Sequence, residues 1–334
     1  MRECCGTVIL NGSLICSLQL RRLRVARAGG QMTLDHLHAE LGNLRQALAW
    51  ASAVPVDGKR VTLGLQLCIS CRDYWRLRHD PREGAGALDQ LLELVDPLVA
   101  GGRGTSATKE MVPPAVLAFA RTELMRVRAS GVPGAPSPWI RMTLDEAITY
   151  FRSVGDRHGE GRALHALSDF VAWTDGDGAE SRALALHAAE VAEVSRDGLT
   201  GPLAHGRVAI AELFAGRDDE AGDRFLPALR LAKSSGNTHA ITNSHWLLGH
   251  FQFNKRQWEE ADIHLSEAEA QGGVVAFTCL LRSEIDVHAG NFPRAREHLN
   301  RLADRIATGH IPEMYLPLVQ IGRGSVARLE GSIT

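Results

Sequence analysis

The sequence lacks the features that would attract nucleic acid or a membrane. Its 334 residues include 37 basic and 39 acidic side chains, which leave a formal net charge of −2. A chain with this balance has no overall field that draws in polyanions or anionic lipids. It also lacks a run of the roughly 18 to 20 apolar residues that a membrane helix needs. We therefore predict no direct nucleic-acid partner and no membrane partner.

Cysteine is scarce, and its spacing does not suggest a disulfide framework. The six cysteines are Cys4, Cys5, Cys16, Cys68, Cys71 and Cys279. This usage fits a reducing cytoplasm, where we predict the protein to be located. Cys68 and Cys71 form a C-x-x-C pair, which suits half of a zinc site or a redox pair. No second Cys or His pair is spaced to complete such a site, so core packing is the favoured interpretation and metal or redox chemistry the alternative.

Motifs of catalysis and of cofactor binding are also missing. The phosphate-binding pattern G-x-x-x-x-G-K-[ST] does not occur, because Gly58-Lys59 lacks the upstream glycine and the following Ser or Thr. No G-x-S-x-G nucleophile motif is present. The histidines His239, His245 and His250 lie close in sequence, but a spacing of five turns His245 and His250 apart on a helix. We expect them to be surface or groove side chains, and we predict no enzyme, no metal and no cofactor.

The sequence does contain a clear helical pair between His245 and Ala268. Two apolar helical patterns flank the polar turn Asn254-Lys255-Arg256-Gln257. Glycine inside a helix costs about 1 kcal/mol relative to alanine. Gly249 therefore indicates a neighbour that leaves no room for a Cβ, and we expect that neighbour to be Ala261.

Alanines of the second helix recur along the chain. They are Ala147, Ala183, Ala221, Ala261 and Ala295, at a spacing of 34 to 40 residues. The residues four and seven positions after each are apolar except His187 and Glu190, so the Ala183 pair fits least well. We expect an insertion in its turn, Asp175-Gly176-Asp177-Gly178. This order of Leu-Gly, Ala, a bulky residue and a small residue resembles the tetratricopeptide (TPR) helical hairpin. The resemblance implies an all-α fold, a right-handed superhelix of TPR-like helical hairpins, or α-solenoid.

The pattern divides the chain into four segments. They are residues 1–31, a poorly ordered leader; residues 32–130, irregular helical hairpins; residues 131–307, TPR-like repeats; and residues 308–334, an incomplete final repeat. In the second segment, a leucine stripe after Thr33 predicts one continuous helix. Its members are Leu34, Leu37, Leu41, Leu44 and Leu48.

The last segment repeats the first-helix signature with Leu318, Ile321 and Gly322. The matching second helix would fall beyond the sequence. Tyr315, Leu318, Val319 and Ile321 would then form an uncovered apolar strip. Contiguous exposed apolar patches usually mark contacts with other chains, so we predict self-association through this end.

A second resemblance lies in Glu40-Leu41-Gly42-Asn43-Leu44-Arg45-Gln46-Ala47-Leu48-Ala49-Trp50. This stretch is similar to the E-x-x-N-L-R-x-A-L-x-W segment that opens the helical-repeat region of large LuxR-type bacterial regulators of the signal-transducing ATPase (STAND) class. Two later segments share the resemblance, Tyr74–Gly84 and Phe151–Glu160. The ATPase motif and the helix-turn-helix of that class are absent. The resemblance implies a non-catalytic sensor or interaction module, and the alternative is a stand-alone TPR adaptor.

The TPR resemblance also assigns side chains to the concave groove of the superhelix. In the pair around Gly249 they are Asn243, Trp246, His250, Phe253 and Asn254, and in the next pair they are Glu284, Val287 and His288. This mixture of aromatic and polar groups suits a peptide, a protein partner or a small effector. The alternative is that Trp246 and Phe253 belong to the core.

Overall fold

The computed structural model describes residues 37–77, 81–95, 112–129, 137–172, 178–271, 275–308 and 315–331. Within these ranges the chain forms helices and no strand. The prediction of an all-α solenoid is therefore confirmed. The predicted leader, residues 1–31, and residues 175–177 of the predicted insertion lie outside the described ranges.

Four described helices form an N-terminal unit: α4 (Leu41–Ala51), α5 (Gly58–Ser70), α6 (Arg72–Leu77) and α7 (Pro81–Glu93). The leucine stripe that predicts one helix from Thr33 is interrupted at Glu40, which is the N-cap of α4 with φ −95° and ψ 8°. Gly42 and Asn43, both of low helix propensity, follow directly. Cys68 and Cys71 are buried and not disulfide-bonded, so they pack in the core of this unit.

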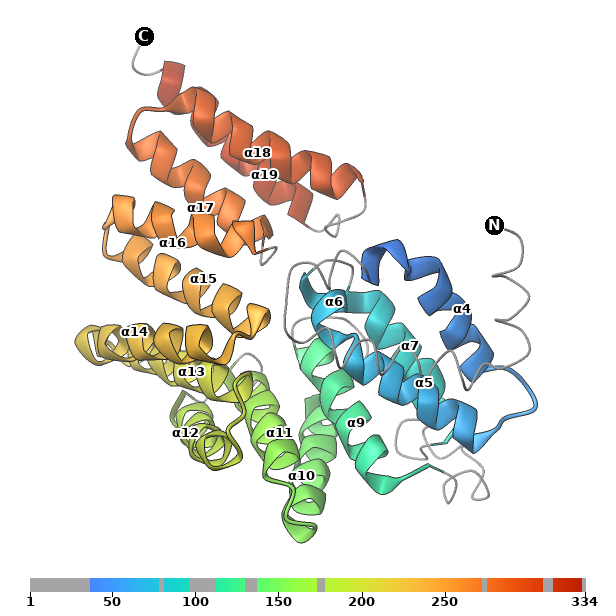
Figure 1. Cartoon of the computed structure of the whole chain (residues 1–334). Coiled ribbons are helices and arrows are strands. Elements are labelled where there is room, and N and C mark those ends of the chain that lie inside the picture. The colour runs from blue at the N-terminus through green and yellow to red at the C-terminus, as the bar shows by residue number, and fades with distance from the viewer. Residues whose placement is uncertain are drawn as a thin grey trace.

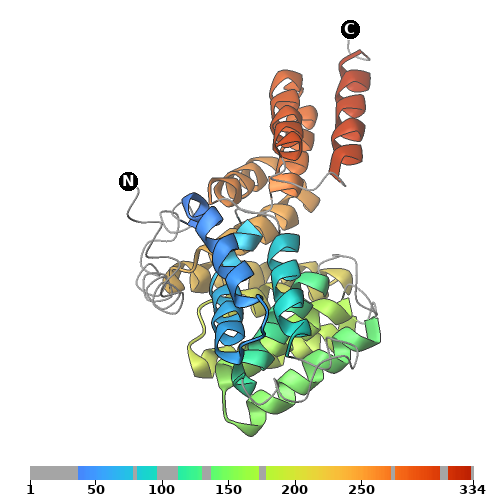
Figure 2. The same cartoon turned by 90° about the vertical axis from the view of Figure 1, so that its right-hand side faces the viewer.

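The remaining described helices form one continuous stack (Figure 1). They are α9 (Pro114–Ala129), α10 (Ser137–Ser153), α11 (Arg157–Phe170), α12 (Gly178–Ser195), α13 (Thr200–Phe214), α14 (Asp218–Ser235), α15 (Thr238–Asn254), α16 (Trp258–Ala270), α17 (Val275–His288), α18 (Phe292–Ala307) and α19 (Leu316–Gly331). Each helix packs against the next one, and the stack rises in an arc from α10 to α19. Figure 2 shows α19 beside the preceding helices at one end of the stack.

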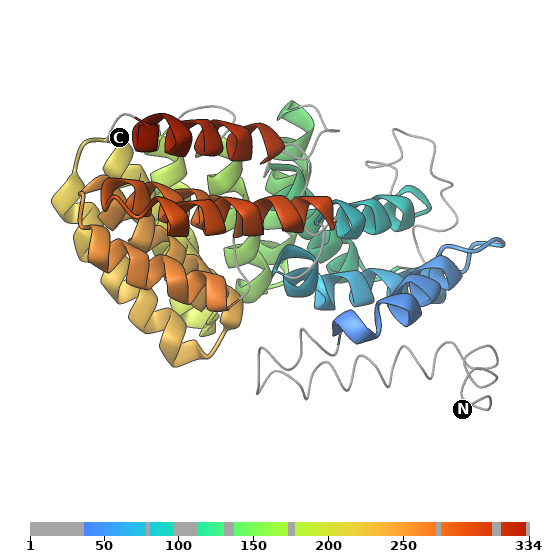
Figure 3. The same ribbon diagram turned by 90° about the horizontal axis from the view of Figure 1, so that it is seen from above.

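The stack has an inner and an outer row of helices. The first helices of the pairs, α9, α11, α13, α15, α17 and α19, each contact the next first helix as well as their own partner. Among the described residues, no comparably extensive contact joins successive second helices. Elements on the inside of a curve lie closer together than those on the outside, so the first helices line the concave side. Seen from above, α4 to α7 lie on one side of the molecule and α14 to α19 on the other (Figure 3).

The repeat register follows the buried alanines of the second helices. Ala147, Ala221, Ala261 and Ala295 are all buried at 1% exposure or less. Ala183, however, is exposed, whereas Ser181, Ala185 and Ala188 of α12 are buried at 1% or less. Ser181 lies three residues after the start of α12, as Ala261 does in α16, and Ala185 and Ala188 follow it by four and seven positions. The predicted register is therefore wrong by two residues in this pair, because its anchor is a serine, which a search for alanines passes over.

Gly249 marks a close approach between α15 and α16. A Cβ at this position would lie 2.9 Å from Cγ and 3.1 Å from the backbone nitrogen of Leu265. The prediction that Ala261 is this neighbour is therefore wrong by one helical turn, because the helices cross nearer to Leu265. Gly322 in α19 plays a similar part, since its Cβ would lie 2.7 Å from Cδ2 of Leu299.

The apolar strip predicted in α19 is not one exposed surface. Val319 is fully buried against the cluster that contains Leu299, whereas Ile321 is 65% exposed. Leu318 and Tyr315 are half-buried. Val319 and Ile321 point to different sides of the helix, so only part of the strip remains uncovered, and self-association through it stays a prediction.

Ion pairs join neighbouring repeats at a separation close to the repeat length. Arg162 of α11 pairs with Glu123 of α9, and Arg141 of α10 pairs with Glu180 of α12, both 39 residues apart in sequence. The first pair is buried and the second is partly exposed. The inner and the outer rows therefore both carry side-chain bonds between successive repeats.

None of the helices in the described ranges is long and apolar enough to cross a lipid bilayer. The longest described helices of the stack, α12 and α14, each have 18 residues. Both carry charged side chains along their length.

Candidate functional site

The first part of the concave side, from α9 to α13, carries paired charges. Glu123 and Arg126 of α9 lie 3.1 Å apart, and Arg162 of α11 also donates to Glu123. These three side chains are less than 9% exposed. Arg207 of α13 extends the network, because its Nε donates to Oδ1 of Asp169 at 2.6 Å. Buried charges of this kind are tolerated when they are paired and hydrogen-bonded.

Helix α6 of the N-terminal unit lies against this charged part. Asp73 Oδ1 is 3.1 Å from Nδ1 of His239, in the first turn of α15. Burial alone would raise the pKa of Asp73, but the charge of Arg72 and the contact with His239 outweigh burial and lower it well below its usual range. Burial, and then the charge of Arg72, lower the pKa of Arg126. The N-terminal unit therefore closes one part of the concave side.

The second part, from α15 to α19, is aromatic and more open. The ring of His250 stacks on Trp246 with centroids 5.7 Å apart, and Trp246 lies 6.5 Å from Phe277 of α17. Phe277 in turn makes an edge contact with Tyr315, just before α19, at 5.6 Å. Phe277 is 42% exposed, and the other three are half-buried. Burial lowers the pKa of His250. These four residues form an aromatic row that runs from α15 across α17 to the residue before α19.

A cavity of about 400 Å³ lies at the other end of α15 and α17. Its lining consists of Phe253, Asn254, Arg256, Trp258, Glu284 and His288. Trp258 stacks on His288 with centroids 4.8 Å apart, and Phe253 meets Trp258 edge-on at 5.3 Å. The volume is within the usual range for a ligand pocket, but the lining is more polar than usual, because four of its six residues carry charged, amide or imidazole groups.

The cavity brings together four of the predicted groove residues, Phe253, Asn254, Glu284 and His288. Trp246 and His250 lie in the aromatic row, one to three turns away on α15. Asn243 is half-buried on α15 and does not line the cavity. Trp246 and Phe253 also pack against the core residues Ala261, Leu265 and Ile285. The interpretation of Trp246 and Phe253 as groove residues and the alternative that they belong to the core therefore both have a basis in the structure.

Three residues of this surface were not predicted from the sequence: Arg256, Trp258 and Phe277. Arg256 lies in the turn, Trp258 begins the second helix, and Phe277 lies early in α17. The repeat pattern assigns groove positions on first helices only, so it missed Arg256 and Trp258. Phe277 occupies the same repeat position as Asn243, six residues before Ser283 as Asn243 is before Gly249, so applying the full pattern to this repeat would have found it.

Two of the three clustered histidines are core residues, which corrects the expectation of surface or groove side chains. His239 and His245 are each 4% exposed. Nδ1 of His245 lies 2.9 Å from Nδ1 of His264 on α16, so one ring must donate and the other accept. Burial, followed by the charges of His264 and Lys233, lowers the pKa of His245 to about 4. Only His250 lies on the aromatic row.

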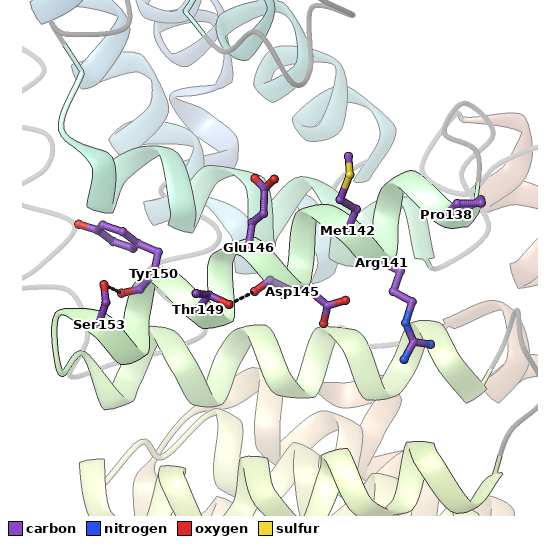
Figure 4. A pocket seen from close by; sticks show the side chains of 8 residues that line it. All are labelled: Pro138, Arg141, Met142, Asp145, Glu146, Thr149, Tyr150 and Ser153. Atoms are coloured by element: carbon purple, nitrogen blue, oxygen red, sulfur yellow. Dashed lines mark hydrogen bonds between the residues drawn. The ribbon is translucent and has the colours of Figure 1, made fainter.

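A second, shallower hollow of about 670 Å³ lies along α10 (Figure 4). Its described lining comes from this helix alone: Pro138, Arg141, Met142, Asp145, Glu146, Thr149, Tyr150 and Ser153. Thr149 and Ser153 donate their hydroxyl hydrogens to carbonyl oxygens of the same helix at 2.8 and 2.7 Å. Arg141 and Glu146 bond to neighbouring helices. The polar groups here serve the packing of the stack, so this surface is the weaker candidate.

No protein-family model matches the chain, and no curated protein matches it. Among solved structures, the chain is similar to the crystal structure of the apo form of RapI, with 13% sequence identity and a TM-score of 0.48. The match covers 96% of this chain and 86% of that chain. The fold class given above comes from the helices of this chain themselves.

Proposed function

We propose that this chain is a non-catalytic helical-repeat module that binds a protein or peptide partner across α15, α17 and α19. One observation carries the proposal: Phe253, Asn254, Glu284 and His288, which the repeat resemblance assigns to a groove, line one cavity. Aromatic side chains with few charges are also the composition enriched at the centre of protein interfaces. The partly exposed row from His250 to Tyr315 extends this surface beyond the cavity.

We infer further that the chain is a fragment or relative of a STAND-class, LuxR-type regulator. Two segments that resemble that class pack together in the N-terminal unit. Arg45 Nε donates to Glu83 at 2.7 Å, and a Cβ at Gly84 would lie 2.6 Å from the ring of Trp75. Leu44 and Trp75 share one apolar cluster. The resembling residues therefore serve the packing of one unit, which supports a shared architecture. The alternative is a stand-alone adaptor in the same cytoplasmic location.

Selection of peptides on the purified chain tests the binding function. Random dodecapeptides are displayed and selected on the full chain, and the enriched sequences are then synthesised with a fluorescent label for anisotropy. We expect Phe277→Ala to weaken binding by about tenfold, because an exposed aromatic anchor at the centre of an interface is worth more than 1 kcal/mol. Its denaturation midpoint should stay close to that of the wild type, since the side chain is 42% exposed.

Met142→Ala is the matched control, because Met142 is 44% exposed on α10, away from the proposed surface. It should leave peptide binding unchanged. Equal binding by wild type and Phe277→Ala, or failure to select any peptide, would overturn the proposed function.

Genomic context separates the regulator from the adaptor. A neighbouring reading frame that encodes a phosphate-binding loop or a LuxR-type helix-turn-helix would support the regulator. The purified chain itself should not bind ATP, because its sequence has no phosphate-binding loop. Saturable ATP binding in calorimetry would contradict both the proposal of a regulator fragment and the alternative of a stand-alone adaptor.

A further inference from the structure

The turn between α15 and α16 differs from its neighbours at one residue. In the turns after α13 and after α17, the residue with positive φ is glycine, Gly216 (φ 73°) and Gly290 (φ 71°). After α15 the same place is taken by Arg256, with φ 59°. Side chains with a Cβ are disfavoured in this left-handed region, where glycine is the usual residue at the end of a helix.

The hydrogen bonds show that the three turns are equivalent. The amide of Arg256 donates to the carbonyl of Phe253 at 2.9 Å, and the next amide, of Gln257, donates to Gln252 at 3.0 Å. Gly216 and Gly290 make the same bonds to the carbonyls of Leu213 and Val287, at 2.9 and 3.0 Å. Glycine would therefore fit at position 256 without any change of backbone. Arg256 therefore carries a side chain at a position where the left-handed backbone favours glycine.

That side chain lines the cavity and is not used by the fold. Within the described residues, Arg256 forms no ion pair and no side-chain hydrogen bond, and the same is true of Glu284 across the cavity. The adjacent cation, Lys255, is different, because it pairs with Asp218 at 2.5 Å. Arg256 and Glu284 both line the cavity, so the cavity offers an unpaired guanidinium beside the aromatic walls of Phe253 and Trp258.

We propose that Arg256 selects the partner by binding an acidic side chain of a peptide segment, whose apolar neighbours pack against Phe253 and Trp258. This inference rests on the proposed function. A guanidinium binds a carboxylate through two parallel hydrogen bonds, which makes arginine well suited to recognise an acidic group. Binding adds no backbone strain at Arg256, because the free chain already holds this residue in the left-handed region, and residues held in this way cluster at functional sites.

The observations favour an acidic partner over a basic one. Glu284 is exposed on the surface of α17, an ordinary place for a glutamate, and its position requires no strain. Of these two charged residues of the cavity, it is Arg256 that has the disfavoured backbone conformation. If the partner is acidic, Glu284 repels it, and removing that charge should strengthen binding.

The test compares Arg256→Gly with Arg196→Gly. Arg196, in the turn before α13, also has a positive φ of 53° and the same bond pattern, but it does not line the cavity. Both variants should keep or raise the denaturation midpoint. The probes are the selected dodecapeptides, synthesised with amidated C-termini so that only side chains supply carboxylates, and matched peptides in which each Glu or Asp is replaced by Gln or Asn.

We expect the selected peptides to be enriched in acidic residues next to aromatic or aliphatic ones. Arg256→Gly should weaken the acidic peptides by about tenfold, the amide peptides by less than about twofold, and Arg196→Gly should change neither. Glu284→Gln should bind the acidic peptides equally or more tightly. If Arg256→Gly binds them as tightly as wild type while Phe277→Ala does not, the role of Arg256 is overturned and the proposed function survives. Enrichment of basic peptides that depend on Glu284 would also overturn it, and peptides insensitive to Phe277→Ala would contradict both proposals.

Discussion

From α9 to α13, the first helices turn charged side chains inward and pair them, whereas from α15 onward they carry aromatic side chains that stay partly exposed. Glu123, Arg126 and Arg162 are buried and bonded to one another. His250 stacks on Trp246 within α15, and Trp246 contacts Phe277 of α17 in a tilted arrangement. The same helical repeat thus makes a closed, structural part and an open part suited to binding.

The largest expected effect comes from the closed part. Glu123→Ala removes the carboxylate that both Arg126 and Arg162 contact and leaves two buried guanidinium groups close together. Removing one partner of a buried ion pair costs about 3 to 5 kcal/mol. Chemical denaturation should show this loss. Replacing the three charges together, in Glu123→Leu with Arg126→Met and Arg162→Met, should recover much of the stability. A mild effect of Glu123→Ala alone would mean that the network is not desolvated.

The next effect is a dependence of stability on pH in the open part. His245 has a pKa lowered from 6.5 to about 4 by burial, by His264 and by Lys233. Because the unfolded chain takes up the proton near pH 6.5 and the folded chain only near pH 4, stability is complete above pH 6.5 and falls as the pH decreases. The loss by pH 4 is on the order of 3 kcal/mol.

His245→Leu should flatten the fall in stability between pH 6.5 and 4, as measured by denaturation at a series of pH values. Glu267 faces His264 on the same helix and opposes part of the effect. His288→Leu, on the exposed end of α17, is the control and should keep the wild-type slope. An unchanged slope for His245→Leu would show that the pair is not buried in solution.

A smaller effect is expected where α15, which carries Trp246 and His250 of the aromatic row, meets α16. Gly249→Ala places a Cβ 2.9 Å from Leu265, and overpacking of this kind typically costs about 1 to 3 kcal/mol. Gly324→Ala, in α19, has no atom within 4 Å of its Cβ and should gain up to about 1 kcal/mol from helix propensity. Equal midpoints for the two variants would mean that the helices do not approach closely at Gly249.

The smallest effect concerns the link between the two parts. Asp73→Asn and His239→Gln each weaken the contact between α6 and α15. A double-mutant cycle should give a coupling of about 0.5 to 1 kcal/mol, because Asp73 remains 31% exposed at its side chain. Zero coupling would mean that α6 and α15 do not depend on each other.

Local patterns in the sequence predicted the helices and their period well. Small residues such as Ala221 and Gly249 are visible because helix crossings exclude larger side chains. The pattern failed at Ala183, where the neighbouring alanines of α12 offer several equivalent registers. The buried residue at the anchor position of α12 is Ser181, which a search for alanines passes over.

The site was predicted only in part, because the deciding contacts lie between distant residues. His239 and Asp73 are 166 residues apart, and no helical period connects them. Four cavity residues were found because they follow the repeat on α15 and α17. Arg256 was missed because positive φ is a property of the backbone, although glycine at the matching turns, Gly216 and Gly290, was a usable signal.

The ion pairs between successive repeats differ in exposure between the inner and the outer row of helices. On the inside, Arg162 and Glu123 are buried, so salt reaches them little, whereas on the outside Arg141 and Glu180 face solvent at 36% exposure each. Rising ionic strength weakens the outer connections first. The buried Arg162–Glu123 connection should therefore persist at salt concentrations at which Arg141–Glu180 contributes little, so the two rows differ in how their side-chain bonds respond to salt.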